Sequence, residues 1–155
     1  MTTTFTETHR RFLRLAYDEA KRGFDEGGCP IGSVLAEGET LIASGRNQRV
    51  QQGDPIAHGE MDCLRRAGRR KSYRGTTLYT SLSPCMMCAG TIVMMGIPRV
   101  VVGENVNFAG EIDFLRSRGV ELLLANDADC IALMRRFIAE KPELWAEDIA
   151  EDPPA

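Results

Sequence analysis

The chain has 155 residues, of which 43% are apolar and 26% are charged, and its formal net charge is −3. This length predicts one domain, residues 1–155, that is large enough to bury a core. A net negative charge gives no general attraction to nucleic acid, so we expect a small-molecule partner instead. No run approaches the roughly 18 apolar residues that span a bilayer, so we expect no membrane partner.

The cysteines favour a reducing compartment. Their number is odd and their spacing irregular, which is a poor basis for a disulfide framework. The first 24 residues are charged throughout and lack the apolar centre of a signal peptide, so we expect a cytoplasmic protein with free thiols. The five are Cys29, Cys63, Cys85, Cys88 and Cys130.

The first half of the chain predicts a helix, a hairpin and a second helix. Apolar residues recur at helical spacing over 8–26, and glycines follow at once. Two strands, 31–36 and 41–44, are separated by a hairpin-length turn. A polar loop over 47–55 leads to a helix over 56–67.

The second half alternates strands with helices. We expect strands over 77–82, 99–103 and 121–125, and helices over 84–95, 111–118, 127–140 and 143–151. A helix over 84–95 would begin with Pro84 in its first turn, where proline is tolerated. The complete order predicts an α/β fold: a three-layer α/β/α sandwich with helices on both faces of a mixed five-stranded sheet.

A metal-binding pattern stands at two of the predicted helix starts. His58 and Glu60 form an H-x-E pair, and Pro84 precedes a C-x-x-C pair made by Cys85 and Cys88. One imidazole and two thiolates leave the fourth position of a tetrahedral Zn²⁺ open, which is typical of a catalytic site. Helix N-termini favour thiolates over thiols, and the i, i+3 spacing places both sulfurs on one face. The pattern predicts one zinc per chain.

Glu60 is the spare carboxylate of this pattern. It lies about 200° around a regular helix from His58, so we expect it not to bind the metal but to face the substrate. Zinc-dependent deaminases of nucleobases carry such a non-ligating glutamate, which moves protons between water and the amino group that leaves.

Two other interpretations of the cysteines stay open at this point. A C-x-x-C pair alone also fits a redox pair or half of a zinc ribbon. A closed structural zinc would need a fourth ligand, such as Cys63 or Cys29. We expect these two cysteines and Cys130 to pack as small apolar residues instead.

Several longer runs resemble the fungal-type cytosine deaminases, within the cytidine and deoxycytidylate deaminase superfamily. The resemblance covers nearly the whole chain. It is carried by residues 27–32, 76–85, 96–99, 101–108 (Val-Val-Gly-Glu-Asn-Val-Asn-Phe) and 145–149 (Trp-Ala-Glu-Asp-Ile).

The resemblance implies a homodimer with one zinc per subunit and assigns roles to individual residues. His58, Cys85 and Cys88 match the zinc ligands, and Glu60 matches the proton shuttle. Residues that match the base-binding positions contribute polar groups or apolar walls. The polar positions are Asn47, the backbone of Gly59, the carbonyl of Ser83 and Asp148; the walls are Ile31, Leu82, Phe108 and Trp145.

The resemblance implies deamination of free cytosine, with other amino-heterocycles (isocytosine, creatinine or guanine) and a tRNA adenosine as alternatives. Trp145 and Asp148 lie i, i+3 apart on the last predicted helix and share a face. A final helix with an aromatic wall and a polar group on one face predicts a lid. Such a lid would close over a free base and obstruct a polymer.

The methionines of 86–95 favour core or subunit packing. The basic residues of 65–71 favour a solvated helix end over an RNA-binding surface.

Overall fold

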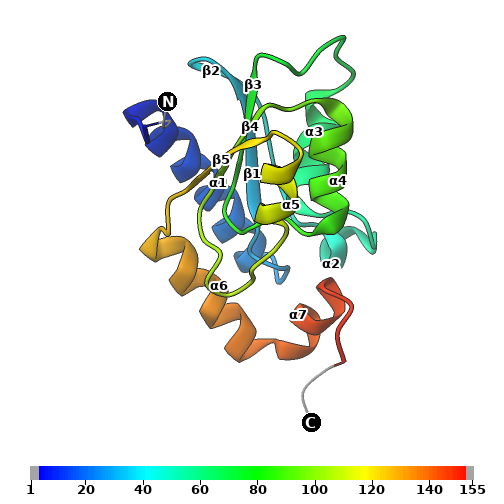
Figure 1. The fold of residues 1–155 in the computed structure, drawn as a ribbon. Helices are drawn as coiled ribbons and strands as arrows, with labels where there is room; N and C mark the ends of the chain where they lie inside the picture. The colour runs from blue at the N-terminus through cyan, green and yellow to red at the C-terminus, as the bar shows by residue number, and fades with distance from the viewer. Residues whose placement is uncertain (1–3, 153–155) are drawn as a thin grey trace.

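The computed structural model describes residues 4–152, so the predicted domain 1–155 extends three residues beyond it at each end. Five strands and seven helices follow one another along the described chain (Figure 1). Their bounds are α1 Glu7–Asp25, β1 Gly32–Glu37, β2 Thr40–Arg46, α2 Arg49–Gln52, α3 Gly59–Ala67, β3 Thr76–Thr80, α4 Met86–Met95, β4 Arg99–Val102, α5 Ile112–Ser117, β5 Glu121–Leu124, α6 Ala128–Glu140 and α7 Pro142–Asp148.

The strands form one mixed sheet in the order β2-β1-β3-β4-β5. β1 pairs antiparallel with both β2 and β3, whereas β3, β4 and β5 run parallel. The parallel pairs require crossovers, which α4 and α5 provide. Because both helices cross on the same face, the loops that enter them from β3 and β4 lie close together.

Side-chain alternation along the central strands separates two cores. Val34 of β1 and Val101 of β4 pack with Phe12 under α1. Leu35 of β1 and Val100 of β4 face the opposite side of the sheet, where α3, α4 and α5 pack. The fold is therefore the predicted three-layer sandwich, with α1 and α6 on one face and α3, α4 and α5 on the other (Figure 1).

One helix was missed and three predicted helix starts were wrong in ways that affect the site. The polar loop contains a short helix, α2, which ends at Gly53 in the left-handed conformation. His58 precedes α3 as its N-cap residue instead of lying inside the helix, and Cys85 is the N-cap residue of α4, so Pro84 lies outside that helix. Pro142 begins α7 instead of only interrupting a helix.

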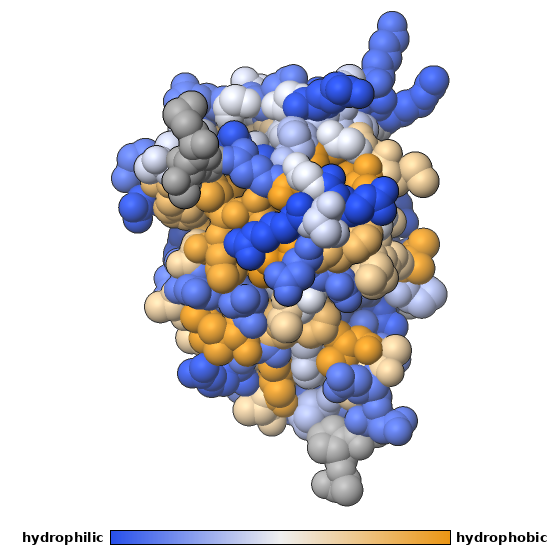
Figure 2. Space-filling model, viewed as in Figure 1, coloured by the Kyte–Doolittle hydropathy of each residue, from blue (hydrophilic) through white to orange (hydrophobic). Residues whose placement is uncertain are grey.

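The surface shown in Figure 2 mixes hydrophobic areas with hydrophilic ones. Within residues 4–152, no helix is both long and apolar enough to cross a membrane.

Candidate active site

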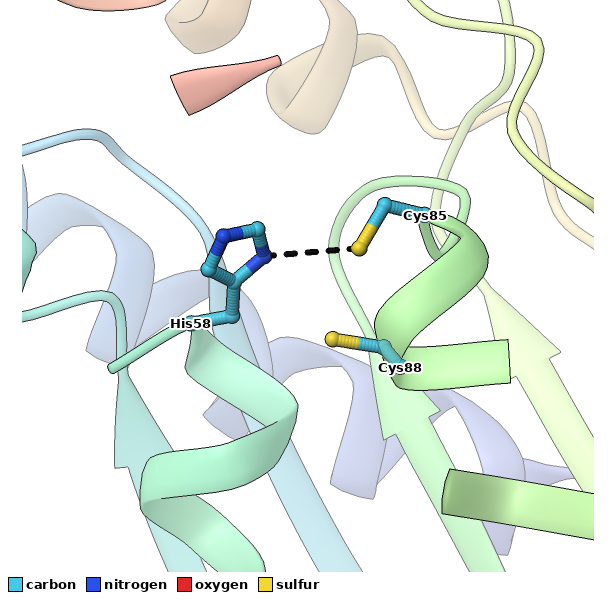
Figure 3. A group of neighbouring side chains, drawn as sticks. All are labelled: His58, Cys85 and Cys88. Atoms are coloured by element: carbon cyan, nitrogen blue, oxygen red, sulfur yellow. Dashed lines mark hydrogen bonds between the residues drawn. The ribbon is translucent and has the colours of Figure 1, made fainter. Parts of the chain in front are cut away.

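Two neighbouring helix starts bring the predicted zinc ligands together. His58 and Cys85 both have extended backbone conformations and end their loops as N-cap residues of α3 and α4. Cys88 follows one turn into α4. In Figure 3 the imidazole of His58 and the sulfurs of Cys85 and Cys88 point into the same space between the two helices.

The three side chains fit a zinc ion. Their ligand atoms lie within 4.8 Å of one another, close enough for one ion with bonds of about 2.0–2.3 Å to draw them together. The Sγ of Cys85 lies 3.5 Å from Nδ1 of His58. Two sulfurs and one imidazole nitrogen are a donor set that zinc prefers, and three protein ligands leave one position open.

The two thiols share their protons unequally. The hydrogen bond from Cys88, followed by that from His58, lowers the pKa of Cys85 to about 4, although burial opposes this. The same hydrogen bond to Cys85, together with burial, raises the pKa of Cys88 well above its usual value. A bound cation would take the place of thiol protons at these two sulfurs.

Histidine 58 is stabilised in its charged form. Burial alone would lower its pKa, but the hydrogen bond that the imidazole donates to Cys85 and the charges of Asp148 and Glu60 raise it. A pocket that stabilises an imidazolium in this way also suits a metal cation, because both bring positive charge to the same place.

Glu60 lies in the first turn of α3, buried beside the two cysteines. Glu60 is only 3% exposed. Burial, and then the negative charge of Cys85, raise the pKa of Glu60 to about 7. Glu60 is not one of the three side chains whose ligand atoms cluster, so its carboxylate is free to face the pocket.

A small pocket lies beside the zinc triad, with His58 and Cys85 in its wall. Most of the predicted site residues line it, together with Ile149, which sequence reasoning missed. Gly59 and Asn47 are not part of this wall. Lining the pocket are Ile31, His58, Glu60, Leu82, Ser83, Cys85, Phe108, Trp145, Asp148 and Ile149.

The outer wall of the pocket consists of two aromatic rings. Phe108 and Trp145 pack edge to face, with their centroids 5.6 Å apart and their planes at 90°. Trp145 belongs to α7, which also presents Asp148 to the pocket. The short C-terminal helix therefore presents both residues to the pocket, in agreement with the shared face that their i, i+3 spacing predicted.

Asn47, which directly follows β2, is hydrogen-bonded to α7. Its Nδ2 donates to Oδ1 of Asp148 at 2.8 Å, and its Oδ1 accepts from the backbone N–H of Arg49 at 3.1 Å. Asn47 is fully buried, and the side chain of Asp148 is 4% exposed. One N–H of the amide and one oxygen of the carboxylate therefore lack a protein partner among these contacts.

Gly59 permits a close approach of two backbones beside the pocket. A Cβ at this position would lie 2.8 Å from the carbonyl oxygen of Ile31. Any other residue would push α3 away from the segment that carries Ile31, so the glycine keeps the two walls of the site at this separation.

Glu104 and Arg49 were not among the predicted site residues. The carboxylate of Glu104 accepts from the backbone N–H groups of Val106 and Asn107 and from Nδ2 of Asn107, at 2.7–2.9 Å. It thereby folds the loop that presents Phe108. Arg49 lies 3.7 Å from Oδ1 of Asp148. An acidic residue two positions after the buried strand β4 was the available signal for Glu104.

The remaining cysteines and charged residues lie outside the site. Cys29, Cys63 and Cys130 are all buried, as predicted, and do not belong to the group of possible metal ligands. Arg65, Arg66 and Lys71 are exposed, which agrees with the prediction of a solvated helix end.

The fold and the site together define a zinc-dependent deaminase: two thiols and an imidazole leave one metal position open, and a non-ligating glutamate lies beside them. The chain belongs to the cytidine and deoxycytidylate deaminase family, because the family profile described as the cytidine and deoxycytidylate deaminase zinc-binding region matches residues 6–104. It is therefore a hydrolase that acts on a C–N bond.

Individual relatives agree with this family. The chain is 48% identical over 145 residues to the cytosine deaminase of Candida albicans, and the alignment covers 92% of this chain and 97% of that protein. It is 38% identical over 114 residues to a tRNA-specific adenosine deaminase of Buchnera aphidicola, covering 72% and 76%. The structure of a guanine deaminase from Nitrosomonas europaea superposes with a TM-score of 0.73 at 21% identity, covering 90% and 87%, and shows the same fold.

Proposed function

We propose that this chain, acting as a single domain, hydrolyses free cytosine to uracil and ammonia. The observation that carries the proposal is Asp148, which lines a small aromatic-walled pocket beside the predicted zinc ligands and accepts a hydrogen bond from the buried Asn47 behind it. The 48% identity to a cytosine deaminase over nearly the whole chain supports the same substrate.

His58, Cys85 and Cys88 would hold the zinc. When bound, the metal would polarise a water molecule so that it loses a proton near neutral pH. Glu60 takes that proton and delivers it to the ring nitrogen as the water oxygen adds to the amino-bearing carbon. It then takes the remaining proton of the added hydroxyl and passes it to the amino group, so that the C–N bond breaks and ammonia leaves. The pocket walls keep bulk water away from the carbon under attack, which strengthens the electrostatic interactions that act on it.

Recognition of the base follows from groups that the protein leaves unpaired. The second N–H of Asn47 suits the ring carbonyl of cytosine, and the second oxygen of Asp148 suits the neighbouring ring N–H. Leu82 and Ile31 contact the ring faces or edges, and Ser83 offers its backbone carbonyl to the amino group. A ribose on the ring nitrogen would remove the N–H and meet the α7 lid.

A substrate panel tests the proposal. Ammonia release is measured from cytosine, cytidine, isocytosine, guanine, creatinine and an adenosine-containing tRNA hairpin, with the Glu60→Gln protein as the background. We expect turnover of cytosine and far slower turnover of cytidine. Equal turnover of cytidine, or a preference for the tRNA hairpin, would contradict the free-base proposal.

We also infer a homodimer. The outer surface of α4 is unusually apolar: Met86, Met94 and Met95 are 55%, 85% and 40% exposed. Methionines adapt their shape to a partner surface and are costly to leave in water. Light scattering should give twice the chain mass of 17.1 kDa, and Met94→Glu should shift it towards one chain mass, whereas the matched exposed change Val106→Glu should not.

The thiol chemistry of the site favours a cytoplasmic location. All five cysteines are free. A disulfide bond between Cys85 and Cys88 would remove two zinc ligands. A fluorescent fusion that co-purifies with the cytosolic fraction is the expected result, and exclusive recovery from an oxidising compartment would contradict it.

A further inference from the structure

Asp62 is a buried carboxylate that the zinc site and the pocket wall do not use. It lies in α3, four residues after His58, and is 3% exposed. Its Oδ2 accepts from the backbone N–H of Arg46 at 3.0 Å and from Nε2 of Gln48 at 3.1 Å. Arg66, which is half exposed, lies 3.3 Å from the same oxygen.

The two buried donors are the chain neighbours of Asn47. Arg46 precedes the base-recognition residue and Gln48 follows it, so one carboxylate oxygen holds both sides of the position. Gln48 also donates its backbone N–H to the carbonyl of Ala57 at 2.8 Å, directly before His58. The segment that carries Asn47 is therefore attached to the zinc-binding helix at two points.

The packing beneath this contact leaves little room for adjustment. A Cβ on Gly45 would lie 2.8 Å from the carbonyl carbon of Asp62 and 2.7 Å from the Cα of Cys63. The end of β2 thus rests directly on the backbone of α3. The Asp62 carboxylate adds hydrogen bonds to this close backbone contact between β2 and α3.

On the basis of the proposed function, we propose that Asp62 is a positioning residue that holds the Asn47 amide at a fixed place relative to His58 and Glu60. A base bound to Asn47 must present its amino-bearing carbon to the zinc site, and a misplacement of about 1 Å is costly for such a reaction. Through this contact, the position of α3 determines the position of the Asn47 amide, although Asp62 itself does not touch the substrate.

A purely structural role would not require this arrangement. A buried carboxylate is costly unless it is well hydrogen-bonded, and an apolar residue would join strand and helix without that cost. Both buried hydrogen bonds of Oδ2 go to residues that flank Asn47. The Asp62 side chain thus restrains one position of the chain, and its loss should lower kcat/KM by displacing Asn47.

A double-mutant cycle tests this inference. The value of kcat/KM for cytosine is measured for the zinc-loaded wild type, Asp62→Asn, Asn47→Ala and the double variant, together with zinc content and thermal stability. We expect Asp62→Asn to lower kcat/KM by about 10- to 100-fold, as is typical of residues that orient a site, and to add little to the loss caused by Asn47→Ala. The control Arg66→Gln removes the exposed ion pair alone and should stay within about twofold of wild type.

The outcomes separate the two proposals. A zinc-loaded wild type that releases no ammonia from cytosine overturns the proposed function and the inference with it. An active wild type in which Asp62→Asn and Asn47→Ala lower kcat/KM by independent factors shows that Asp62 does not act through Asn47. If Asp62→Asn does not fold, Gln48→Leu removes one of the two hydrogen bonds, and the same cycle with Asn47→Ala decides between the two results.

Discussion

The zinc end of the active site and its recognition end are built in different ways. His58, Cys85 and Cys88 occupy the starts of two helices that pack on the central sheet. The residues to which we assign base recognition come from the end of β2, from a loop after β4 and from the short helix α7. In the proposed function, the chemistry therefore depends on the centre of the fold, and selection of the base depends on parts near its edge.

This difference has a consequence for mutation. A change at the zinc end should abolish the reaction for every substrate, because all substrates need the same attacking water. A change at the recognition end should alter which substrate is used and how well. The following predictions compare the two ends and run from the largest expected effect to the smallest.

Loss of a zinc ligand should have the largest effect. Cys85→Ala leaves two ligands, so the protein should lose both its zinc and its measurable ammonia release. Cys63→Ala is the matched control, because Cys63 is also a buried cysteine near α4 but is not part of the ligand group. Elemental analysis and activity are measured together, and full zinc in Cys85→Ala would rule out its role as a ligand.

Removal of the proton shuttle should have the next largest effect. Glu60→Gln keeps the size of the side chain but cannot accept a proton, so kcat should fall by about 10²–10⁴-fold or more. The zinc content should stay the same, since Glu60 is not among the ligands. Glu37→Gln, at an exposed glutamate of β1, is the control and should be unaffected. Turnover retained by Glu60→Gln would exclude the shuttle role.

Loss of the lid carboxylate should have a smaller and more selective effect. Asp148→Ala leaves a buried ring N–H without an acceptor, which costs about 1–3 kcal/mol, or about 5- to 150-fold in kcat/KM. Zinc should remain bound. The neighbouring Glu147→Ala removes an exposed carboxylate of the same helix and serves as the control. Identical kinetics for Asp148→Ala and the parent would show that α7 does not recognise the base.

The smallest effect concerns stability and pH. Burial raises the pKa of Asp148, against the opposing effects of His58 and of the hydrogen bond from Asn47. A raised pKa means that the folded state binds the proton more tightly, so the contribution of Asp148 to stability is complete below its unfolded pKa of about 3.9 and is lost as pH rises through the folded value.

We therefore expect Asp148→Asn to become more stable relative to the parent as pH rises above about 3.9 and through the folded pKa of Asp148, by about 1.4 kcal/mol for each pH unit by which the pKa is raised. The measurement is the difference in unfolding free energy between the two metal-free proteins at each pH. A difference that does not change with pH, or that changes in the opposite direction, would contradict this cause.

The sequence predicted the zinc end more completely than its surroundings. His58, Glu60, Cys85 and Cys88 stand in two short motifs whose chemistry is readable from residue type and spacing alone. The exact helix starts were wrong, because an N-cap residue has extended backbone and the periodicity of the helix does not mark it. The helix α2 was missed since its four residues, Arg-Val-Gln-Gln, carry no apolar period.

The recognition end needed the fold. The resemblance indicated Asn47, Phe108, Trp145 and Asp148, but the hydrogen bond between Asn47 and Asp148 joins residues 101 positions apart. The supporting carboxylates of Asp62 and Glu104 were not identified at all. Each looks like an ordinary charged residue in the sequence, and only its burial beside backbone N–H groups reveals what it holds in place.

The aromatic pair above the pocket also gives the protein a built-in optical probe. Trp145 is the only tryptophan of the chain, and its indole is buried against the edge or face of Phe108. Indole emission shifts to longer wavelength when water reaches the ring, so tryptophan fluorescence would report any movement of α7 away from the site. Opening, base binding and product departure should therefore be observable in a stopped-flow experiment on the unlabelled protein.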